Sequence, residues 1–460
     1  MILGCGFAGL YTALNLQKSL PRSRGVEITL VNRENFFLFT PMLHEIAASD
    51  LEITSIVSPI RALLPRVNFV CAEVESIALE SRTVGVVHSE SRHRHELAYD
   101  QLVIALGSVT NFFGLPGLQE HAFTFKSLGD AIALRNHLLR CLEDADFECA
   151  RDLRTRLLTF VVAGGGFSGV EVGGALNDFV REALASYRHL NDSMVRVVLV
   201  HAGPVILPEL GEELGRFAQS KLSGRHVEVL LETRVNAVSD RGVELTDGRV
   251  IEAATLVWTA GTSPHPLLGS LPVQKQGNRI VVDEYLEVPG WPGVWALGDC
   301  AVIPDSRTGK PYPPTAQHAV REGRIAAQNV IATLTGGRKA RFAFSTLGQL
   351  AAIGKRTGVA RILGVQFSGF VAWWLWRTID LAKLPSLRKK LRVAIDWTFD
   401  LVFSRDLVQF QTQREAATSI RPGKAGYDQF GAPLSSDGGA VPPPPSDRNT
   451  KADRRPFQMI

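Results

Sequence analysis

Apolar and polar positions at the start of the chain predict a strand, a turn and a helix. Ile2 and Leu3 are apolar, GCGFAG at residues 4–9 supplies a glycine-rich turn, and the segment LYTALNLQKSL that follows is typical of a helix. A second apolar strand is predicted at residues 26–31. Strand, turn, helix and strand in this order form the first half of a βαβ unit.

The same order returns about 160 residues later. A strand is predicted at 157–162, the turn GGGFSG at 164–169, a long helix at 170–190 and a strand at 195–200. The pattern predicts an α/β protein with two dinucleotide-binding domains. Further short apolar strands follow each copy, at 67–74, 83–87 and before Gly107, then at 227–231, 242–246 and before Gly261.

The last third of the chain has a different pattern. It begins with a strand at 280–283, the segment GVWALGDCA and a helix at about 315–334. Four of the seven tryptophans then lie within the 25 positions from Trp373 to Trp397. From residue 411 the chain is rich in Pro, Gly, Ser and charge. It lacks the apolar surface that would offset the entropy of ordering, so we expect a disordered tail.

Charge and cysteine content narrow the class. Lys and Arg number 50 against 46 Asp and Glu, a net charge of +4 that is too small to favour a nucleic-acid partner. The five cysteines include no C-x-x-C pair, which favours a reducing compartment. No apolar run reaches the roughly 18 residues of a membrane span, and the first residues lack a signal-peptide pattern. We expect no membrane-crossing helix and no secretion.

The two glycine turns carry the strongest chemical signal. Glycines let the backbone approach a pyrophosphate at a helix N-terminus, where free N–H groups and the helix dipole favour negative charge. One G-x-G-x-x-G turn is a weak signal, but two copies, each between a strand and a helix, are much stronger. The alternative is that both are plain structural turns. The positions are Gly4, Gly6 and Gly9, then Gly164, Gly166 and Gly169.

The residue at the end of the second strand departs from the usual pattern in both copies. This position ordinarily holds an acid that bonds the ribose hydroxyls. Here it is Asn32, with Glu34 two residues on, and in the second copy His201. Asn32 can still bond a ribose hydroxyl. His201 can donate to one or, when protonated, attract a 2′-phosphate, so the residues alone do not decide between NADH and NADPH.

Longer motifs resemble those of a known family. YDQLVIALGS, NFFGLPG, FTFKSLGDAIALR, VWTAG and GVWALGDCA are similar to motifs of the two-dinucleotide-domain flavoproteins. Within that group, LFTPMLHEIA, GGGFSGVEVGGALNDF and TAQHAVREG resemble the type II NADH:quinone oxidoreductases. The resemblance covers about residues 1–408. It implies an α/β fold with two Rossmann-like domains, one for noncovalently bound FAD and one for NAD, and a C-terminal membrane-associating helical segment.

The resemblance also divides the chain. Residues 1–112 and 280–335 are expected to form the FAD-binding domain, and 113–279 the NAD(P)H-binding domain. Residues 336–410 are expected to form the membrane-anchoring and quinone-site segment, and 411–460 the disordered tail.

Site residues are carried over from the motifs of the family. Glu171, expected two residues into its helix, matches the acid between flavin and nicotinamide, unless it only stabilises the helix dipole from the first turn. Asp299 is expected on the ribityl and phosphate side of FAD, unless it is merely a helix N-cap. Residues 40–43 would lie along the isoalloxazine ring. No metal site is expected. The cofactor-binding set is Gly4, Gly6, Gly9, Asn32, Thr40, Pro41, Leu43, Gly107, Gly164, Gly166, Gly169, His201, Gly261, Gly298, Asp299, Ala316 and Gln317.

A quinone site is implied by TAQHAVREG, which resembles the AQxAxQ element of the family. Ala316, Gln317 and Ala319 match that element. Gln317 can hydrogen-bond a quinone carbonyl, and its backbone can approach the flavin. Arg321 replaces the second Gln, which leaves the head-group contacts open. The alternative is a buried helix start without a quinone role.

Residues 370–403 are expected to lie on a membrane surface. Trp favours the bilayer interface and Lys and Arg favour anionic head groups, so one or two surface helices are predicted. The alternative is a helix pair packed on the body or on a second subunit, which would show the same pattern of apolar residues and cations. The apolar side holds Val371, Trp374, Leu375, Leu391, Ile395 and Phe399, and the cations are Arg377, Lys383, Arg388, Lys389, Lys390 and Arg392.

Together with the resemblance, these residues predict an FAD-dependent enzyme that passes two electrons from NADH to a membrane quinone without pumping protons. NADPH is the less expected donor. A sulfide:quinone oxidoreductase or a disulfide reductase needs paired cysteines beside the flavin, but Cys5 stands alone and no Cys follows Cys300. A membrane-docking redox sensor that binds NAD is a third interpretation. We expect a peripheral protein on the cytoplasmic face of the inner (plasma) membrane, with a homodimer left open.

The first strand is shorter than its counterpart. The second copy has six residues at 157–162, but only Met1, Ile2 and Leu3 precede Gly4, although this strand is central in the doubly wound order. Half a strand would leave backbone groups of its neighbours unpaired, at roughly 1 to 3 kcal/mol each. We therefore expect the natural polypeptide to begin several residues upstream.

Overall fold

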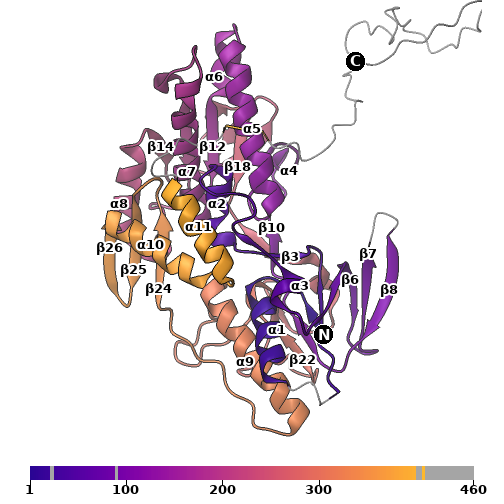
Figure 1. Ribbon diagram of the computed structural model, residues 1–460. Coiled ribbons are helices and arrows are strands. Elements are labelled where there is room, and N and C mark those ends of the chain that lie inside the picture. Colours follow the sequence, from indigo (N-terminus) through magenta and orange to yellow (C-terminus); the bar gives the residue numbers. More distant parts are fainter. Residues whose placement is uncertain (21–24, 89–91, 400–406, 410–460) are drawn as a thin grey trace, which may run out of the picture. The chain divides into compact units, whose positions relative to one another are not determined.

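Two parallel sheets carry the two glycine turns in the computed structural model, which describes residues 1–20, 25–88, 92–399 and 407–409 (Figure 1). The first sheet has the order β22 (Val294–Ala296), β9 (Leu102–Ile104), β1 (Ile2–Leu3), β2 (Thr29–Asn32), β5 (Asn68–Cys71). The second has the order β11 (Phe123–Thr124), β18 (Thr255–Trp258), β12 (Thr159–Ala163), β13 (Arg196–Val200), β14 (Val227–Leu230). In each sheet the strand before the glycine turn is central, which confirms the two Rossmann-like halves.

Burial explains why these segments are strands. Every residue of β9, β12 and β18 is buried, as expected where helices cover both faces of a parallel sheet. β1 pairs with β2 on one side and β9 on the other. Apolar runs of this kind favour the parallel sheet because both faces exclude water.

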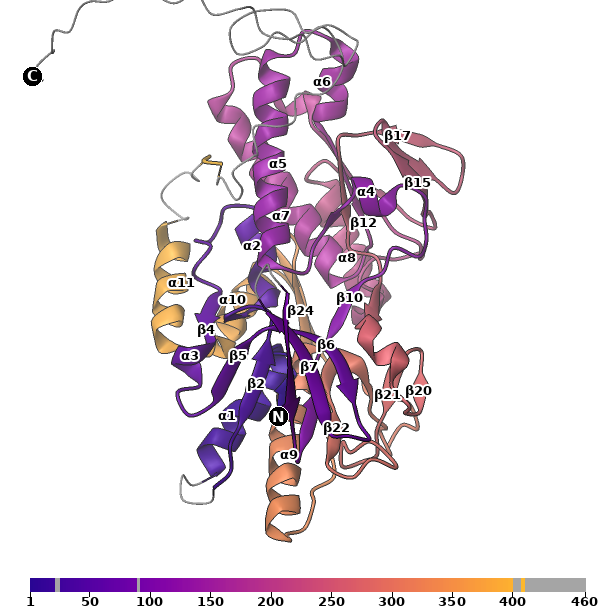
Figure 2. The ribbon, with the colours of Figure 1, turned by 90° about the vertical axis from the view of Figure 1, so that its right-hand side faces the viewer.

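Helices follow each turn. α1 (Phe7–Ser19) lies against α9 (Ala316–Thr335), and Figures 1 and 2 show the pair side by side. A Cβ at Gly323 would lie 2.5 Å from the carbonyl oxygen of Ala8, so glycine is required for this close approach. α7 (Phe167–Ala183) follows the second turn and contacts α2 (Leu43–Ala47).

Several predicted boundaries are wrong. β2 begins at Thr29 rather than at residue 26, and β12 begins at Thr159 because Leu157 ends the polar helix α6 (Arg151–Leu157). The helix predicted at 170–190 ends earlier, since α7 gives way to the 3₁₀ turn η3 (Leu184–Ser186). The single strand predicted at 67–74 is two strands in different sheets, β5 and β6 (Glu73–Ala78).

The smaller elements complete the two domains. A ribbon of β10 (Ser108–Thr110) and β19 (Thr262–Pro264) pairs the two segments that leave VIALG and VWTAG. The remaining strands are β3 (Phe36–Leu38), β4 (Val57–Pro59), β7 (Thr83–His88), β8 (His93–Ala98), β15 (Val235–Ser239), β16 (Gly242–Leu245), β17 (Val250–Glu252), β20 (Lys275–Gln276), β21 (Arg279–Val281) and β23 (Ala301–Val302). The remaining helices are α3 (Ile60–Leu63), α4 (Leu118–His121), α5 (Leu128–Phe147), α8 (Glu212–Ser223), η2 (Thr40–Met42), η4 (Asp192–Met194), η5 (Pro208–Leu210), η6 (Pro266–Ser270) and η7 (Gly298–Cys300).

The C-terminal segment contains a sheet that the sequence analysis missed. The antiparallel strands β24 (Gly348–Ala352), β25 (Gly358–Ile362) and β26 (Val365–Gly369) precede the expected helices α10 (Phe370–Lys383) and α11 (Leu387–Phe399). The strands are short and rich in glycine, so their sequence does not show the alternation typical of strands. α10 packs on all of them.

Tryptophans in this segment divide between two roles. Trp373, Trp376 and Trp397 are buried against the body, whereas the side chain of Trp374 is 54% exposed. Trp374, the tryptophan named on the predicted apolar side, is exposed as expected, whereas the other three clustered rings are core and add nothing to that surface. The exposed apolar residues on the two helices are Phe370, Val371, Trp374, Leu387, Leu391, Ile395 and Phe399.

The described residues all belong to one compact unit. The predicted disordered tail, 411–460, and residues 400–403 of the predicted surface segment lie outside the described residues. Within the described ranges no helix has the length and apolar character to cross a membrane, and no cluster of three or more ligand residues suits a metal. The proposed domain boundaries stay predictions, although both parallel sheets fall within them.

Candidate active site

The first glycine turn leaves space at the start of α1. A Cβ at Gly9 would lie 1.9 Å from the carbonyl oxygen of Gly4, so Gly9 must be glycine for the helix to meet the strand. A Cβ at Gly6 would meet no described atom within 4 Å. Among the described residues no side chain caps α1, and its first turn has no acid. The free N–H groups and the open space fit a phosphate.

The second turn repeats this geometry. A Cβ at Gly169 would lie 1.7 Å from the carbonyl oxygen of Gly164, and the space beside Gly166 is open to 4 Å among described atoms. No described side chain caps α7, and no acid occupies its first turn. The N-termini of α1 and α7, which follow strands of different sheets, therefore offer the same kind of anion site. This favours binding over the plain structural turns that the sequence left open.

The residues at the ends of the second strands both bond back to the turns. The backbone N–H of Cys5 donates to Asn32 Oδ1 at 2.9 Å, and that of Gly165 donates to His201 Nδ1 at 3.1 Å. Asn32 Nδ2 also donates to the carbonyl oxygen of Glu34 at 2.7 Å. In place of the usual acid, each copy therefore has a side chain that accepts from the N–H of the second residue of its turn. No sequence motif indicated these two hydrogen bonds.

The hydrogen bond to Gly165 fixes the state of His201. An imidazole nitrogen that accepts carries no proton, so the neutral ring has its proton on Nε2. Burial lowers the pKa of His201, while a backbone hydrogen bond at Val205 and the Glu209 carboxylate act in the opposite direction. Near pH 7 the ring is therefore neutral and carries no positive charge, and its one N–H bonds the backbone at Val205.

Asp299 lies within η7 and is held by other side chains. Leu297, not Asp299, occupies the N-cap of η7, so the N-cap alternative is wrong. Ser108 Oγ donates to Asp299 Oδ2 at 2.6 Å. The N–H of Gly298 donates to Glu322 Oε2 at 2.7 Å, and burial raises the pKa of Glu322 to about 7. Ser108 and Glu322 were not singled out from the sequence, although ALGS and TAQHAVREG contain them.

Residues 40–43, which are predicted to lie along the isoalloxazine ring, differ in burial. Thr40 is exposed, and Pro41 is half-buried. Leu43 is 2% exposed and belongs to the hydrophobic core. The side chain of Leu43 therefore packs inward, whereas Thr40 and Pro41 have more exposed surface, and the placement of all three along an isoalloxazine ring stays a prediction.

Glu171 lies deeper than expected. It is the fifth residue of α7 rather than the second, and the first turn of α7 holds no acid in the described structure, so the helix-dipole alternative is wrong. Its Oε2 lies 3.8 Å from His44 Nδ1, and the two side chains are 13% and 6% exposed. Burial raises the pKa of Glu171 well above its usual value, and burial lowers that of His44 to about 3. The direction of both pKa shifts favours the neutral forms of the two groups over an ion pair.

Other buried acids surround this pair. Asp380 and Glu45 add to the rise in the pKa of Glu171, while a hydrogen bond at the backbone of Ala352 opposes it. Glu45 Oε2 accepts from Trp397 Nε1 at 3.0 Å, and Asp380 pairs with Lys383 at 3.0 Å. A cavity of about 20 Å³, large enough for one water, is lined in part by His44, Glu45, Trp373 and Trp376. No sequence pattern indicated that these acids from separate segments would meet.

Gln317 begins the helix expected to face a quinone, but its side chain is already engaged. Nε2 donates to the carbonyl oxygen of Gly348 at 3.1 Å, and Oε1 accepts from the N–H of Leu347 at 3.3 Å. Arg321 donates to the carbonyl oxygen of Gln317 at 2.8 Å, and its guanidinium lies 4.0 Å from the ring centre of Phe344. Gln317 therefore ties α9 to β24, and Arg321 supports that junction.

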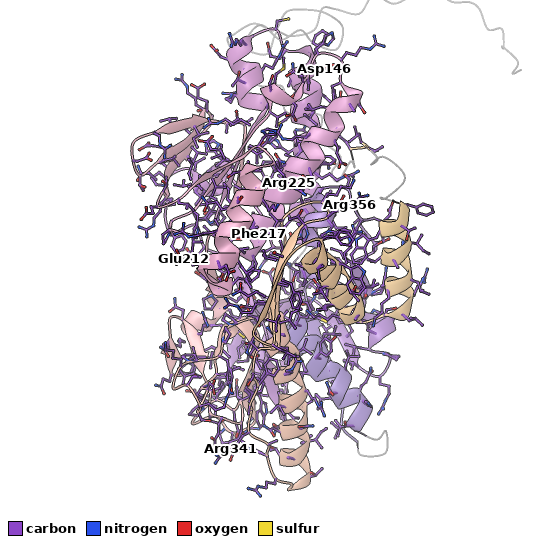
Figure 3. All side chains as sticks on the ribbon, turned by 90° about the vertical axis from the view of Figure 1, so that its left-hand side faces the viewer. Asp146, Glu212, Phe217, Arg225, Arg341 and Arg356 are labelled. Atoms are coloured by element: carbon purple, nitrogen blue, oxygen red, sulfur yellow. The ribbon has the colours of Figure 1, made fainter. Side chains whose placement is uncertain are left out.

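The C-terminal sheet is also tied to the second domain. Arg225, labelled in Figure 3, pairs with Asp178 of α7 at 2.8 Å and also donates to Thr357 Oγ1 at 3.0 Å. A Cβ at Gly174 would lie 2.8 Å from the backbone nitrogen of Gly354, so α7 and the turn after β24 are in close contact. This packing encloses the helix that carries Glu171.

Comparisons with known proteins agree with this arrangement. The pyridine nucleotide-disulphide oxidoreductase family model matches residues 1–323, and the NDH2 C-terminal domain model matches 347–406. A probable NADH dehydrogenase of Dictyostelium discoideum is 34% identical, over 89% of this chain and 91% of that protein. The type II NADH:quinone oxidoreductase Ndh of Mycobacterium tuberculosis is 31% identical, over 88% of each.

A solved structure supports the fold. The structure of NDH2 from Plasmodium falciparum in complex with NADH has a TM-score of 0.82 and 22% identity, and covers 88% of this chain and 99% of that one. At this identity the likeness concerns the fold alone. The family models and the relatives above 30% identity carry the assignment, and the chain belongs to the type II NADH:quinone oxidoreductase family.

Proposed function

We propose that the chain oxidises NADH, with FAD as its resident cofactor, and passes the two electrons to a membrane quinone. The observation that carries this proposal is the pair of uncapped glycine turns in the described structure, each with open space at a helix N-terminus. The first turn shares its sheet with the segment that leads to Asp299, so we assign FAD to it and the nicotinamide nucleotide to the second. When bound, the flavin accepts a hydride and delivers electrons, while the protein supplies position and excludes water.

The residues of the chain would hold the two nucleotides in different ways. The N–H groups around Gly6 and Gly166 would bind the pyrophosphates, and Asp299 would accept from the ribityl side of FAD. His201 would face the adenosine ribose as a neutral ring. Because a neutral ring does not attract a 2′-phosphate, we propose a preference for NADH over NADPH.

Glu171 would hold a proton near the reacting centre. Reduction of a quinone to its hydroquinone takes up two protons. The raised pKa of Glu171 favours the protonated form of its carboxyl, the form that donates, in a position that bulk water reaches poorly. We propose Glu171 as the acid of the quinone half-reaction.

Gln317 and Ala316 remain the candidates on the quinone side. An amide NH₂ has two donors, so the bond to Gly348 leaves the second for a quinone carbonyl. The two bonds to the β24 edge would fix the direction of that donor. Arg321 would act through the backbone of Gln317 rather than on the quinone itself.

Peripheral membrane binding would use α10 and α11. Leu387, Leu391 and Ile395 are each more than half exposed, and Arg388 and Arg392 border the same shallow depression. Apolar side chains next to cations suit an interface with anionic lipid, at about 1 kcal/mol per cation. We propose that this face holds the protein at the cytoplasmic side of the membrane, and a homodimer through the same face is the competing use.

A turnover assay tests the proposed function. The purified protein should contain FAD and should sustain repeated turnover of NADH under anaerobic conditions only when a short-chain quinone is supplied. A protein that binds NADH but does not turn over would instead support the redox-sensor interpretation.

Vesicle binding tests the surface. Leu391→Glu together with Ile395→Glu should release the protein from anionic vesicles, whereas Val250→Glu, an equally exposed site on β17, should not. If the intact protein does not bind vesicles but sediments as a dimer, the result would favour a homodimer through this face.

A further inference from the structure

Three segments of the chain meet at Asp299. Asp299 belongs to η7, Ser108 begins the ribbon strand β10, and Lys126 lies between β11 and α5. Lys126 Nζ donates to Ser108 Oγ at 2.6 Å and to the Ser108 carbonyl oxygen at 2.9 Å. Ser108 Oγ in turn donates to Asp299 Oδ2 at 2.6 Å. An ammonium, a hydroxyl and a carboxylate therefore form one chain of hydrogen bonds.

The direction of these bonds follows from what each group can do. An ammonium has only donors, so Ser108 Oγ must accept from Lys126. The one proton of the hydroxyl is then directed to Asp299. Bonds that end on charged groups are shorter and stronger than neutral ones, and bonds in a chain polarise one another. Lys126 thus fixes the rotamer of Ser108, and Ser108 fixes one oxygen of Asp299.

Lys126 is itself held in place. Its backbone N–H donates to Asp130 Oδ2 at 2.8 Å, and Asp130 closes a capping box with Ser127 at the start of α5. The side chain is half-buried, and burial lowers the pKa of Lys126 while Asp299 and Asp130 raise it. A partly buried ammonium next to two carboxylates is stabilised as a cation by their charge.

The connection crosses between the domains. Lys126 follows β11 at the edge of the second parallel sheet, which is the nicotinamide side, whereas Asp299 follows β22 of the first. Ser108 stands where the chain leaves the first sheet for the β10–β19 ribbon. The ammonium therefore joins the nicotinamide domain to the carboxylate assigned to FAD.

We propose that Lys126 is a positioning residue that fixes Asp299 through Ser108, so that retention of FAD depends on a side chain from the nicotinamide domain. This inference rests on the assignment of Asp299 to FAD in the proposed function. A merely structural Lys126 would change thermal stability without changing the affinity for FAD. The two roles therefore differ in a quantity that does not depend on turnover.

The test measures FAD release from the holoenzyme, by the flavin fluorescence that appears on dilution, in variants of the three residues. Lys126→Met and Ser108→Ala should each weaken FAD binding by roughly tenfold to a hundredfold, as expected when a bond to a charged group is lost. The double variant should be little worse than either single variant, because both act on the same chain of bonds. Lys126→Arg should recover part of the affinity.

The control is Lys221→Met, an exposed lysine of α8 that contacts only the ring of Phe217 among its described partners. It should leave FAD release unchanged. Circular dichroism identifies any variant that fails to fold. If Lys126→Met fails to fold, Ser108→Ala still tests the proposal. FAD release from Lys126→Met at the control rate, or independent losses in the double variant, would overturn the proposal.

One more variant separates the inference from its premise. Asp299→Asn should release FAD faster than any of the others. If it binds FAD normally, the assignment of Asp299 is wrong and the inference falls with it. If it releases FAD while Lys126→Met does not, the assignment stands and only the role of Lys126 is refuted.

Discussion

The two glycine turns are built alike but surrounded differently. In both, the N–H of the second turn residue, Cys5 or Gly165, donates to the side chain that ends the next strand. Seven residues after the first glycine of each turn stand Tyr11 and Glu171. Tyr11 is half-buried, whereas Glu171 faces His44 in an enclosed cluster of acids. The two turns are thus built alike, and the helix of the second copy carries an additional acid in an enclosed cluster.

Packing explains this difference. α1 lies against α9, which falls in the segment 280–335 that is predicted to share a domain with the first sheet. α7 instead lies against α2 and β24, two elements from distant parts of the chain. A helix and a strand from other segments therefore enclose Glu171 and raise its pKa, and a glycine turn alone would not do so.

The largest expected effect comes from filling the open space of each turn. Gly6 and Gly166 have φ of −73° and −78°, so alanine is not strained at either position. Gly6→Ala should place a methyl group where a phosphate would lie and weaken FAD binding by roughly a hundredfold, giving colourless protein. Gly166→Ala should keep the yellow colour and raise the KM for NADH instead. Equal FAD content in the two variants would remove the distinction between the turns.

Replacing Glu171 and Tyr11 tests the acid. Glu171→Gln should lower kcat with quinone by roughly 100-fold, the usual scale for loss of a general acid, and Tyr11→Phe should leave it unchanged. FAD content should be normal in both. Stopped-flow traces in which both flavin reduction and reoxidation run at wild-type rates in Glu171→Gln would refute the role.

Glu171 also predicts a pH dependence. An acid must be protonated to donate, so kcat should fall as pH rises through the raised pKa of Glu171. In Glu171→Gln this fall of kcat with rising pH should be absent. The folded state binds more protons here than the unfolded state, so the free energy of unfolding should decrease as pH rises above the ordinary Glu value. Denaturant unfolding of the wild type and of Glu171→Gln at several pH values measures this. Identical pH dependence in the two proteins would contradict it.

His201 should set the nucleotide preference. His201→Glu should raise the ratio of kcat/KM for NADH over NADPH by roughly tenfold, because a carboxylate accepts from the ribose hydroxyls and repels a 2′-phosphate. Asn32→Asp at the matching position should leave that ratio unchanged. A wild-type ratio at or below one would refute the proposed preference for NADH.

The smallest expected effect is the response of the second turn to acid. Protonation of His201 removes the acceptor for the N–H of Gly165, so the KM for NADH should rise about threefold as pH falls below the pKa of His201. Because burial lowers that pKa, the folded state binds fewer protons than the unfolded one, and stability should also fall below about pH 6.5. Asn32 does not titrate, so FAD retention should stay constant. His201→Asn should flatten the KM profile, and an unchanged profile would count against this role.

Local features of the fold were predictable and distant contacts were not. The turns and the strands before them follow from a few neighbouring residues, such as Gly164 to Gly169 after β12. The hydrogen bond between Ser108 and Asp299 joins residues 191 positions apart, and that between Trp397 and Glu45 joins residues 352 apart. Neither has a pattern in the sequence, because only the tertiary fold brings these residues together.

Boundaries failed where polar or glycine-rich stretches conceal structure. Leu157 continues a helix rather than opening a strand, and the strands of the C-terminal sheet lack a clear alternation. The depth of Glu171 was also missed, since its enclosure depends on α2 and β24. Burial of three of the four clustered tryptophans has the same origin, because spacing alone does not distinguish a core face from a membrane face.

The central claim is that one bound flavin links NADH to a quinone, and the visible spectrum of the purified protein tests it directly. Under anaerobic conditions, one equivalent of NADH should bleach the flavin band, and one equivalent of a short-chain quinone should restore it. Gly166→Ala should need far more NADH for the same bleaching. A protein without a flavin band, or with a band that NADH does not bleach or quinone does not restore, would contradict the account.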